Sequence, residues 1–283
     1  MTTWSIRATG GGFVIRAVAS LGMYDHPAQQ RANDLLWAGI ARALREDGVD
    51  GVPDTLDRTR DVHALWRDPG LLFGQACGYP LVSEPSLYLR VLALPVYAVA
   101  GRDGPTHRSV IVCRSDDPRG SLAAFHRSRA AVNDARSNTG MNLLRATIAR
   151  AALPTPFFDT IVRTGSHRES VIAVGTARVD IAAIDEVTYA ALVRFEPNLV
   201  ARLRIIASSP DSPTLPFVTA ATTSDDMVRK LRTALGRAIA DPALADVRAT
   251  LFLADVVPAD ADALAPIVAL ETAAVGAGHA ALA

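Results

Sequence analysis

Short apolar runs alternate with amphipathic segments along most of the chain. Apolar runs of four to eight residues are typical of buried strands, and apolar residues three and four apart are typical of helices. The strand-like runs are 18–24, 71–75, 91–97, 109–113, 129–132, 178–185, 203–207 and 216–219. The helical segments are 27–46, 62–66, 122–125, 137–152, 186–193, 225–240, 242–248, 258–275 and one that begins at 167, and a turn is predicted at 78–80. This alternation predicts a mostly parallel α/β architecture.

Charge and composition narrow the class of protein. The 283 residues carry 29 Lys or Arg and 29 Asp or Glu, so the formal net charge at pH 7 is zero. Aromatic residues make up 6% and no basic stripe is present, so a nucleic-acid partner is not expected. The spacing of Cys77 and Cys113 fits neither a metal site nor a disulfide scaffold. A bond between the two is one alternative, and two buried thiols are the expected one. The length suits one large or two medium-sized domains.

The first residues bear on where the protein resides. A secretory signal needs an uninterrupted apolar stretch and a cleavage site of small residues. The candidate stretch 10–21 contains Arg16, and it overlaps the first predicted strand, which cleavage would destroy. The alternatives are a cytoplasmic protein and one whose signal is missing from this sequence.

The run 133–142 combines small hydroxyl and amide side chains with the helical pattern that follows it. Ser137, Asn138 and Thr139 are of types preferred at helix N-caps, and Gly140 allows the backbone to approach a ligand closely. The free N–H groups and the positive dipole end of a helix attract anions. The run therefore predicts either a seat for an anion or a plain helix cap.

A second helix is predicted to begin at His167. Ser166 and Glu169 have the spacing of a capping box, which places His167 in a first turn where the helix dipole disfavours its cation. His167 is then either a neutral ligand contact or an exposed surface histidine. Asp185 ends the next strand-like run, at the edge where open α/β sheets bind ligands. Capping of helix 186–193 is the other role open to Asp185.

Several motifs follow one another in an order that resembles a known family. They are LGMYD at 21–25, DLLW at 34–37, LWRDPGLLFGQACGYPL at 65–81, ALPVY at 93–97, RSVIV at 108–112, the run 133–142, the helix at 167 with the run 180–185, and LPFVT at 215–219. The sequence resembles the phosphate/phosphite/phosphonate substrate-binding proteins of ABC importers, the phosphonate-binding-protein-like group of type II periplasmic binding proteins. The resemblance covers nearly all of the chain after about Val18.

This resemblance implies two α/β lobes joined by two crossing strands, with the ligand in the cleft between them. Lobe 1 is expected to comprise 18–99 and 213–283, and lobe 2 is expected to comprise 100–212. The resemblance implies an oxyanion site on side chains and backbone at Ser137, Asn138, Thr139 and Gly140, with His167 donating, Tyr24 closing the cleft and Asp185 facing the organic end of the ligand. Gln75 and Tyr79, on the loop that follows a lobe 1 strand, are further candidate contacts.

By resemblance, the chain is a periplasmic solute-binding protein for a small phosphorus oxyanion. It is expected to act as a monomer without cofactor or metal, to close about a hinge and to deliver its ligand to an ABC transporter permease. Asp185 is expected to favour a ligand that carries an amine or a protonated hydroxyl at this position and to disfavour a second anionic group.

Two other classes stay open. An enzyme on the same fold is one, although the sequence shows no activated nucleophile, no Gly-rich nucleotide fingerprint and no metal-ligand cluster. A cytoplasmic ligand sensor is the other, and it needs a separate partner chain to bind DNA, because the residues before Val18 are too few for a helix-turn-helix.

Overall fold

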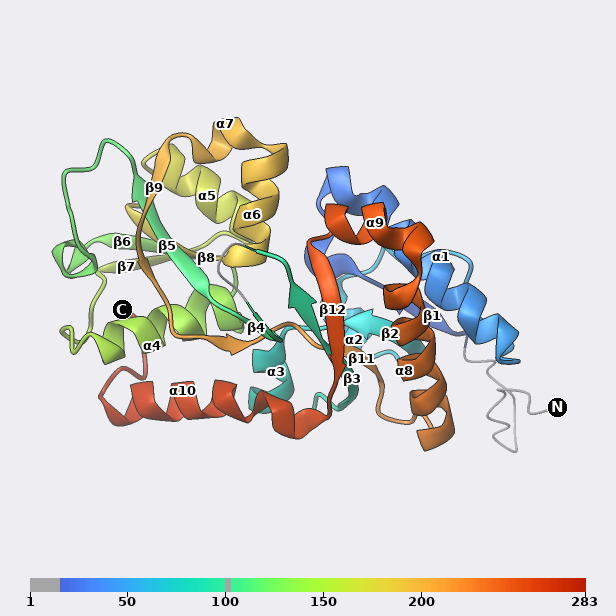
Figure 1. Ribbon diagram of the computed structural model, residues 1–283. Helices are drawn as coiled ribbons and strands as arrows, with labels where there is room; N and C mark the ends of the chain where they lie inside the picture. Colours follow the sequence, from blue (N-terminus) through green and yellow to red (C-terminus); the bar gives the residue numbers. More distant parts are fainter. Residues whose placement is uncertain (1–15, 100–102) are drawn as a thin grey trace.

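The computed structural model describes residues 16–99 and 103–283, which form two lobes side by side (Figure 1). Each lobe is built on a five-stranded sheet. In lobe 1 the strand order is β1 (Val18–Ser20), β2 (Leu71–Gln75), β11 (Phe217–Ala220), β3 (Leu89–Tyr97) and β12 (Leu253–Pro258). In lobe 2 the order is β7 (Thr160–Arg163), β6 (Arg129–Val132), β8 (Ile181–Asp185), β5 (Ser109–Arg114) and β9 (Leu203–Ser208). The predicted two-lobed α/β fold is confirmed.

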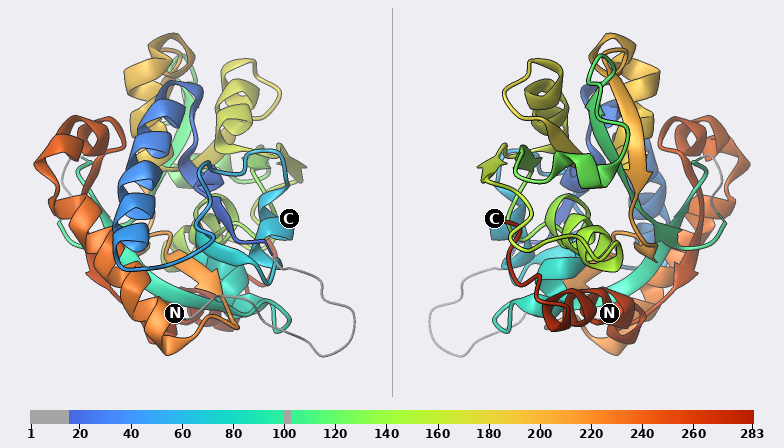
Figure 2. Two further views of the ribbon diagram at one scale, coloured as in Figure 1. Left: turned by 90° about the vertical axis from the view of Figure 1, so that its right-hand side faces the viewer. Right: turned by 90° about the vertical axis from the view of Figure 1, so that its left-hand side faces the viewer.

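Helices cover both faces of the lobe 1 sheet. One face packs against α1 (Gln30–Glu46), α8 (Asp225–Ala240) and α9 (Ala245–Thr250), and the other against α2 (Val62–Trp66) and α3 (Gly78–Ser83). Helix α1 lies beside α8 on the outside of the lobe (Figure 2). Its buried residues Leu36, Ile40 and Leu44 are four positions apart, which gives one apolar face, and Gly48 with φ of 73° follows its end.

The lobe 2 sheet is also covered on both faces, and the alternation of strand residues shows how. In β5, Ile111 and Cys113 point to one core with the helix α4 (Leu143–Arg150) and the short helix Leu122–Phe125. Val110 and Val112 point to the other core, with α5 (His167–Gly175) and α6 (Glu186–Phe195), next to α7 (Pro197–Val200). Side chains of a strand point to opposite faces in turn, so this strand contributes to two separate cores.

Two short strands pass between the lobes. β4 (Thr106–His107) pairs antiparallel with β10 (Ser212–Pro213). The helix α10 (Ala265–Gly276) follows β12 and packs against both α3 of lobe 1 and α4 of lobe 2. The chain then ends in lobe 2, where the carbonyl oxygen of Leu282 accepts hydrogen bonds from the N–H groups of Phe157 and Phe158 at 3.3 and 3.0 Å. The lobe boundaries at 99 and 212 stay a prediction.

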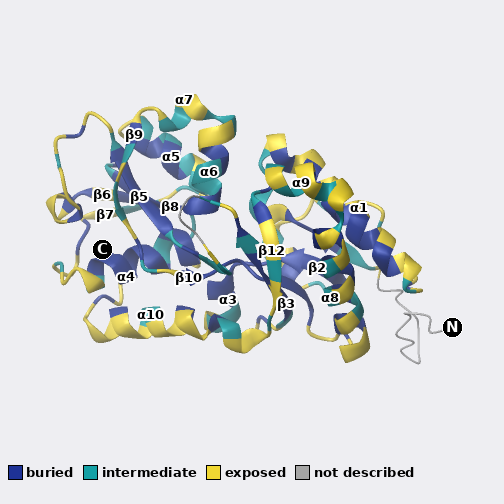
Figure 3. Cartoon of the chain, viewed as in Figure 1, coloured by how far each residue is buried: buried dark blue, intermediate teal, exposed yellow. Residues whose placement is uncertain are grey.

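The prediction of mostly parallel sheets was wrong, because both sheets are mixed. β11 runs antiparallel to β2 and β3, and β5 runs antiparallel to β8 and β9. A strand that is buried on both faces is a continuous apolar run in either direction, so the sequence pattern does not show its direction. The sequence pattern also missed β12, an edge strand whose residues are mostly exposed (Figure 3).

Two local predictions also need correction. The first strand ends at Ser20 and is followed by a single helical turn, Gly22–Tyr24, so Tyr24 is not a strand residue. The expected turn at 78–80 is the start of α3. Gly, Tyr and Pro favour a turn by composition, but Pro80 lies in the first helical turn, where its missing N–H costs no hydrogen bond. The first half of the candidate signal 10–21, residues 10–15, lies outside the described residues.

Candidate functional site

A cavity of about 730 Å³ lies between the two lobes. The lining residues from the first part of the chain are Gly22, Met23, Tyr24, Asp25, His26, Pro27, Gln29, Asp61, Val62, His63, Trp66, Cys77 and Pro80. Those from lobe 2 are Asn133, Asp134, Arg136, Ser137, Thr139, Gly165, Ser166, His167, Arg168, Asp185, Val187, Thr188, Ala191 and Leu192, and Leu215 and Leu251 complete the lining. Of the predicted site residues, Tyr24, Ser137, Thr139, His167 and Asp185 are in this lining. Pockets of this size between lobes are typical ligand sites.

The predicted anion seat is the start of a helix that faces the cavity. A π-helical turn, Asn138–Asn142, leads into α4, and the Ser137 hydroxyl caps it by accepting a hydrogen bond from the N–H of Gly140 at 2.9 Å. A Cβ atom at Gly140 would lie 1.7 Å from Oδ1 of Asn133, so a side chain does not fit there unless Asn133 moves. Gly140 is itself buried behind the seat, and we assign it a steric role.

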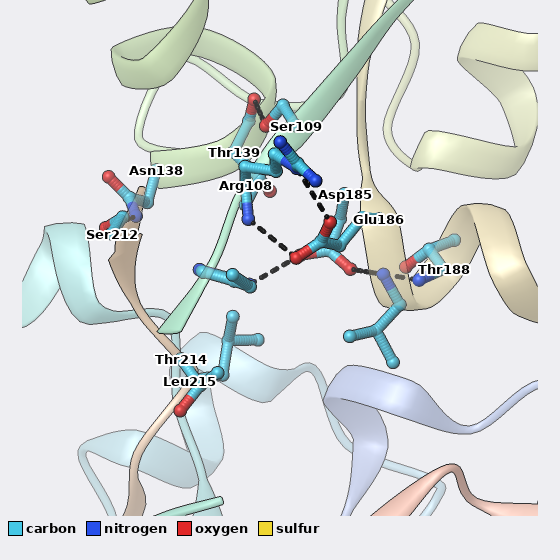
Figure 4. Close-up of polar contacts among 12 residues, drawn as sticks. Arg108, Ser109, Asn138, Thr139, Asp185, Glu186, Thr188, Ser212, Thr214 and Leu215 are labelled. Carbon is cyan, nitrogen blue, oxygen red and sulfur yellow. Dashed lines mark hydrogen bonds and ion pairs between the residues drawn. The ribbon is translucent and has the colours of Figure 1, made fainter. Parts of the chain in front are cut away.

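The structure directs Asn138 away from the cavity. Its amide nitrogen Nδ2 donates to the hydroxyl of Ser212, which lies beside it in Figure 4, at 2.8 Å. Its Oδ1 accepts from Nδ2 of Asn142 at 3.1 Å. The side chain therefore ties the seat to strand β10 rather than facing a ligand. Its backbone N–H points to lobe 1, where it donates to Sγ of Cys77 at 3.4 Å.

His167 stands in the first turn of α5, as the sequence predicts. The Ser166 hydroxyl caps this helix by accepting from the N–H of Glu169 at 3.1 Å. Nε2 of His167 is 2.9 Å from the Thr139 hydroxyl, so the imidazole joins the two helix starts. Burial lowers the pKa of His167 from its ordinary value although Asp185 opposes the shift, which keeps the ring neutral at pH 7.

The carboxylate of Asp185 has close contacts with four other residues of the site. Asp185 ends β8 and caps α6, because its Oδ1 accepts from the N–H groups of Val187 and Thr188, both at 2.9 Å (Figure 4). Its Oδ2 accepts from the hydroxyl of Tyr24 in lobe 1 at 2.9 Å. Oδ2 is also 3.0 Å from Nδ1 of His107, although the ring is not well aligned for a hydrogen bond.

The charge states within this cluster follow from burial and neighbours. Burial by itself raises the pKa of Asp185, but His107, His167 and the N–H of Thr188 together outweigh it and hold the pKa below its ordinary value, so the group is a carboxylate. Burial and the Asp185 carboxylate raise the pKa of Tyr24 well above its ordinary value, so the hydroxyl keeps its proton. Tyr24 therefore donates to Asp185 across the two lobes.

Two predicted contacts lie outside the cavity lining. Nε2 of Gln75 donates to the hydroxyl of Tyr97 at 2.9 Å and to the carbonyl oxygen of Leu215 at 3.1 Å, inside lobe 1. The hydroxyl of Tyr79 donates to Oε1 of Glu271 at 2.5 Å, on the side facing α10. Both side chains are buried and engaged within the protein. A ligand role for Gln75 and Tyr79 stays a prediction without support from their positions.

Sequence reasoning missed His107 and Cys77. His107 is 1% exposed and lies on the two-residue strand β4, which is too short to give a periodic signal. Cys77 lines the cavity and faces the start of the helix at 138, and burial raises the pKa of its thiol to about 11. No local pattern marks either residue, since each acts through residues distant in sequence.

The lobes also meet at the two rims of the cavity. At one rim, Nε2 of His26 is 2.9 Å from Oε1 of Glu196. The other oxygen of this carboxylate, Oε2, pairs with Nη2 of Arg168 at 2.7 Å. At the other rim, Nη1 of Arg136 in lobe 2 donates to Oε1 of Glu84 in lobe 1 at 3.3 Å. These contacts, together with the bond from Tyr24 to Asp185, describe a closed arrangement of the lobes.

We expect acid to weaken the rim contact at Glu196. Arg168 bonds to this carboxyl and outweighs its burial, which lowers the pKa of Glu196 from 4.5 to about 2. The stabilisation is therefore complete above pH 4.5 and is lost as the pH falls from 4.5 toward 2. Glu196→Gln should cost about 2 kcal/mol of unfolding free energy at pH 7, allowing for partial exposure of the pair, and close to nothing near pH 2.

Urea unfolding at a series of pH values checks this expectation. Glu46→Gln is the matched control, because Glu46 pairs with Arg42 at 4.0 Å with both side chains more than half exposed. Its stability difference should be small and independent of pH. A Glu196→Gln difference of the same size at pH 7 and pH 3 would show that the pair adds no pH-dependent stability.

Two α/β lobes with a cavity between them give this chain the architecture of the type II periplasmic binding protein fold. Residues 73–264 match the family described as ABC transporter, phosphonate, periplasmic substrate-binding protein, and the chain belongs to this family. This family consists of substrate-binding transport components rather than enzymes, and it is periplasmic. Comparison with curated proteins gives no match.

Solved structures show the same fold at low sequence identity. A binding-protein component of an ABC phosphonate transporter from Pseudomonas aeruginosa is 18% identical with a TM-score of 0.74, and the match covers 93% of this chain and 87% of that chain. PhnD1 from Prochlorococcus marinus, in complex with methylphosphonate, is 12% identical with a TM-score of 0.73 and coverage of 90% and 96%. A Xanthomonas citri protein bound to ATP is 17% identical with a TM-score of 0.68 and coverage of 93% and 97%.

Residues 16–99 and 103–283 hold no group of three or more His, Cys, Asp or Glu side chains placed to bind a metal ion. Within the same ranges, no helix has the length and apolar character needed to cross a membrane.

Proposed function

We propose that this protein captures a small phosphorus oxyanion, namely phosphate, phosphite or a phosphonate, in its interlobe cavity and delivers it to an ABC importer. The observation that carries the proposal is the seat formed by Ser137, Thr139 and His167, where two helices begin at one cavity. Relatives with this fold hold methylphosphonate and ATP, which both carry phosphorus oxyanions. The proposed partner is the permease, and the proposed location is the periplasm.

The seat suits an oxyanion by its chemistry. N–H groups at a helix start and hydroxyl groups donate to tetrahedral oxygens, and the helix dipoles favour negative charge there. The neutral imidazole of His167 adds a donor without the cost of burying a cation. Arg136 and Arg168 also line the cavity, each paired with carboxylates at its rims. The ligand is proposed to be held when the two lobes close about the β4–β10 crossing.

A thermal-shift screen tests the proposal. The purified protein is heated with phosphate, phosphite, sulfate, methylphosphonate or 2-aminoethylphosphonate, and every hit is measured by calorimetry. A ligand that binds only the native state raises the melting temperature by mass action. A shift with phosphorus oxyanions and none with sulfate supports the proposal. The absence of any shift with the phosphorus compounds would refute it.

Removal of the His167 imidazole should weaken binding. We expect His167→Ala to cost about 1–3 kcal/mol of binding free energy for the best oxyanion, the usual effect of losing a hydrogen bond to a charged group. Calorimetry on the variant measures the loss. His126→Ala is the control, because His126 is exposed on lobe 2 and lies outside the cavity lining. Equal affinities for the His167 variant and the unmodified protein would remove His167 from the site.

A further inference from the structure

The interlobe cavity is much larger than a small tetrahedral oxyanion. Its volume is about 730 Å³. A water molecule takes about 30 Å³ of the liquid, so the cavity has room for roughly two dozen atoms of that size. Phosphate and methylphosphonate have only five non-hydrogen atoms each. A ligand that fills the cavity therefore carries a substantial group in addition to its oxyanion.

The cavity has this volume although the two lobes are already in contact. Tyr24 reaches Asp185 at 2.9 Å, His26 reaches Glu196 at 2.9 Å, and Arg136 reaches Glu84 at 3.3 Å, so contacts join the lobes beside the seat and at both rims. Further closure about the hinge would force these groups into each other. The space is therefore present while the lobes are in contact, and it has room for an organic group of the ligand.

Away from the seat, much of the wall is apolar. The apolar side chains that line it are Met23, Val62 and Trp66 from lobe 1 and Val187, Ala191 and Leu192 from lobe 2. Apolar walls with a few placed polar groups are typical of pockets for organic molecules. Water in contact with these side chains is displaced favourably by an apolar group of the ligand.

The buried carboxylate beside the apolar wall, Asp185, leaves no vacant acceptor for an amine on the ligand. A carboxylate has about four acceptor positions, and those of Asp185 face Val187, Thr188, Tyr24 and His107. Of the other three carboxylates in the lining, Asp25 is engaged through both oxygens. Asp61 and Asp134 each accept through one oxygen only, but they are exposed or partly exposed, so an amine paired with either gains little. Asp25 pairs with Arg58 at 2.6 Å, Asp61 caps α2, and Asp134 accepts from the N–H of Arg136 at 2.7 Å.

We propose that the ligand is a phosphorus oxyanion with a bulky, uncharged and largely apolar organic group, which lies against the wall around Val62 and Ala191. This inference rests on the proposed function, since the oxyanion seat anchors the ligand. It names a substrate class that excludes bare phosphate and amine-bearing phosphonates as the preferred ligands. The organic group lies across the apolar side chains of both lobes.

Calorimetry on the full chain with a set of phosphonates tests this inference. The probes are methylphosphonate, ethylphosphonate, 2-aminoethylphosphonate, phenylphosphonate and phenyl phosphate, with benzyl alcohol as an aromatic control that lacks the oxyanion. We expect phenylphosphonate or phenyl phosphate to bind at least tenfold more tightly than methylphosphonate. We expect 2-aminoethylphosphonate to bind at least tenfold more weakly than ethylphosphonate, and benzyl alcohol not to bind.

The outcomes separate this inference from the proposed function. Equal or tighter binding of methylphosphonate relative to both phenyl compounds overturns the inference and leaves the proposed function in place. Tighter binding of 2-aminoethylphosphonate than of ethylphosphonate also overturns it. Failure of every phosphorus compound to bind overturns both. Comparison of phenylphosphonate with phenyl phosphate shows whether the preferred source is a phosphonate or a phosphate ester.

A filling variant locates the organic group. Val62 is partly exposed at the start of α2 and lines the cavity, so Val62→Phe reduces the space without touching the seat. We expect the variant to lower the affinity for the more tightly bound phenyl compound at least tenfold and to change the affinity for methylphosphonate by less than twofold. Retained methylphosphonate binding also shows that the variant is folded. Ala191→Met makes the same change from lobe 2 if Val62→Phe does not fold. Unchanged phenyl affinity in a folded variant would exclude this wall as the binding surface.

Discussion

Asp185→Ala is expected to lower the free energy of unfolding by about 3–5 kcal/mol, because it removes a buried carboxylate from a site built around it. The variant leaves the N–H groups of Val187 and Thr188 without their cap, and it leaves the Tyr24 hydroxyl and His107 without a partner. Each of these groups is buried or partly buried, so water replaces the lost contacts poorly. Urea unfolding at pH 7 measures the loss.

Two variants separate the contributions at this position. Asp61 makes the same two-bond cap on α2 but is exposed and has no Tyr or His partner, so Asp61→Ala should cost only about 1 kcal/mol. Asp185→Asn keeps a carbonyl oxygen for the cap and loses the charge that faces His107. Its loss of unfolding free energy should therefore lie between those of Asp61→Ala and Asp185→Ala. If Asp185→Ala cost no more than Asp61→Ala, the contacts to Tyr24 and His107 would add no net stability.

Arg145→Ala should cost about 3 kcal/mol of unfolding free energy, since it removes a buried guanidinium from a partly buried ion pair and leaves its other partners behind. The guanidinium of Arg145 is buried in α4 and bonds to Glu271 on α10 at 3.0 Å and to Tyr79 on α3 at 3.3 Å. It also donates to Oδ1 of Asn142 at 2.8 Å and to the carbonyl oxygen of Ala280 at 3.3 Å. The Arg145 side chain thus links α10 to α4 of lobe 2 and to α3 of lobe 1.

Hydrogen exchange gives a readout specific to this fastening. The amides of Phe157 and Phe158 donate to the carbonyl oxygen of Leu282, so they should exchange faster in Arg145→Ala when the C-terminal residues detach. Arg150→Ala, an exposed position in the last turn of the same helix, is the control and should change little. A small stability loss with unchanged exchange at Phe157 and Phe158 would show that the C-terminal residues hold to lobe 2 without Arg145.

The parts of the fold that were predicted correctly are those with strong local signals. The bounds of α2, β2 and β6 match the sequence pattern, and α5 begins at His167 because Ser166 caps it. The N-cap role of Asp185 was also one of the two readings that the sequence left open. These features depend on side chains and N–H groups within about four residues of each other, so they are written in consecutive residues.

The arrangement of the strands and the rest of the site could not be predicted from local sequence signals. The antiparallel direction of β5 and β11 and the exposed edge strand β12 arise from how the sheets assemble. His107 reaches Asp185 because the first residue of β5, Ser109, pairs with the last residue of β8, Asp185. No periodicity around position 107 indicates this contact, because the strand that carries it has two residues.

By itself the sequence determined the fold class, the family resemblance and the starts of the two helices that place Ser137, Thr139 and His167. Only the tertiary structure decided which polar side chains face the cavity. It turned Asn138 toward Ser212, placed Gln75 and Tyr79 in contacts away from the cavity, and joined Tyr24 to Asp185. The physical reason is distance along the chain. A helix cap is completed within one turn, whereas the bond from Tyr24 to Asp185 joins residues 161 positions apart and exists only when both lobes are folded and closed.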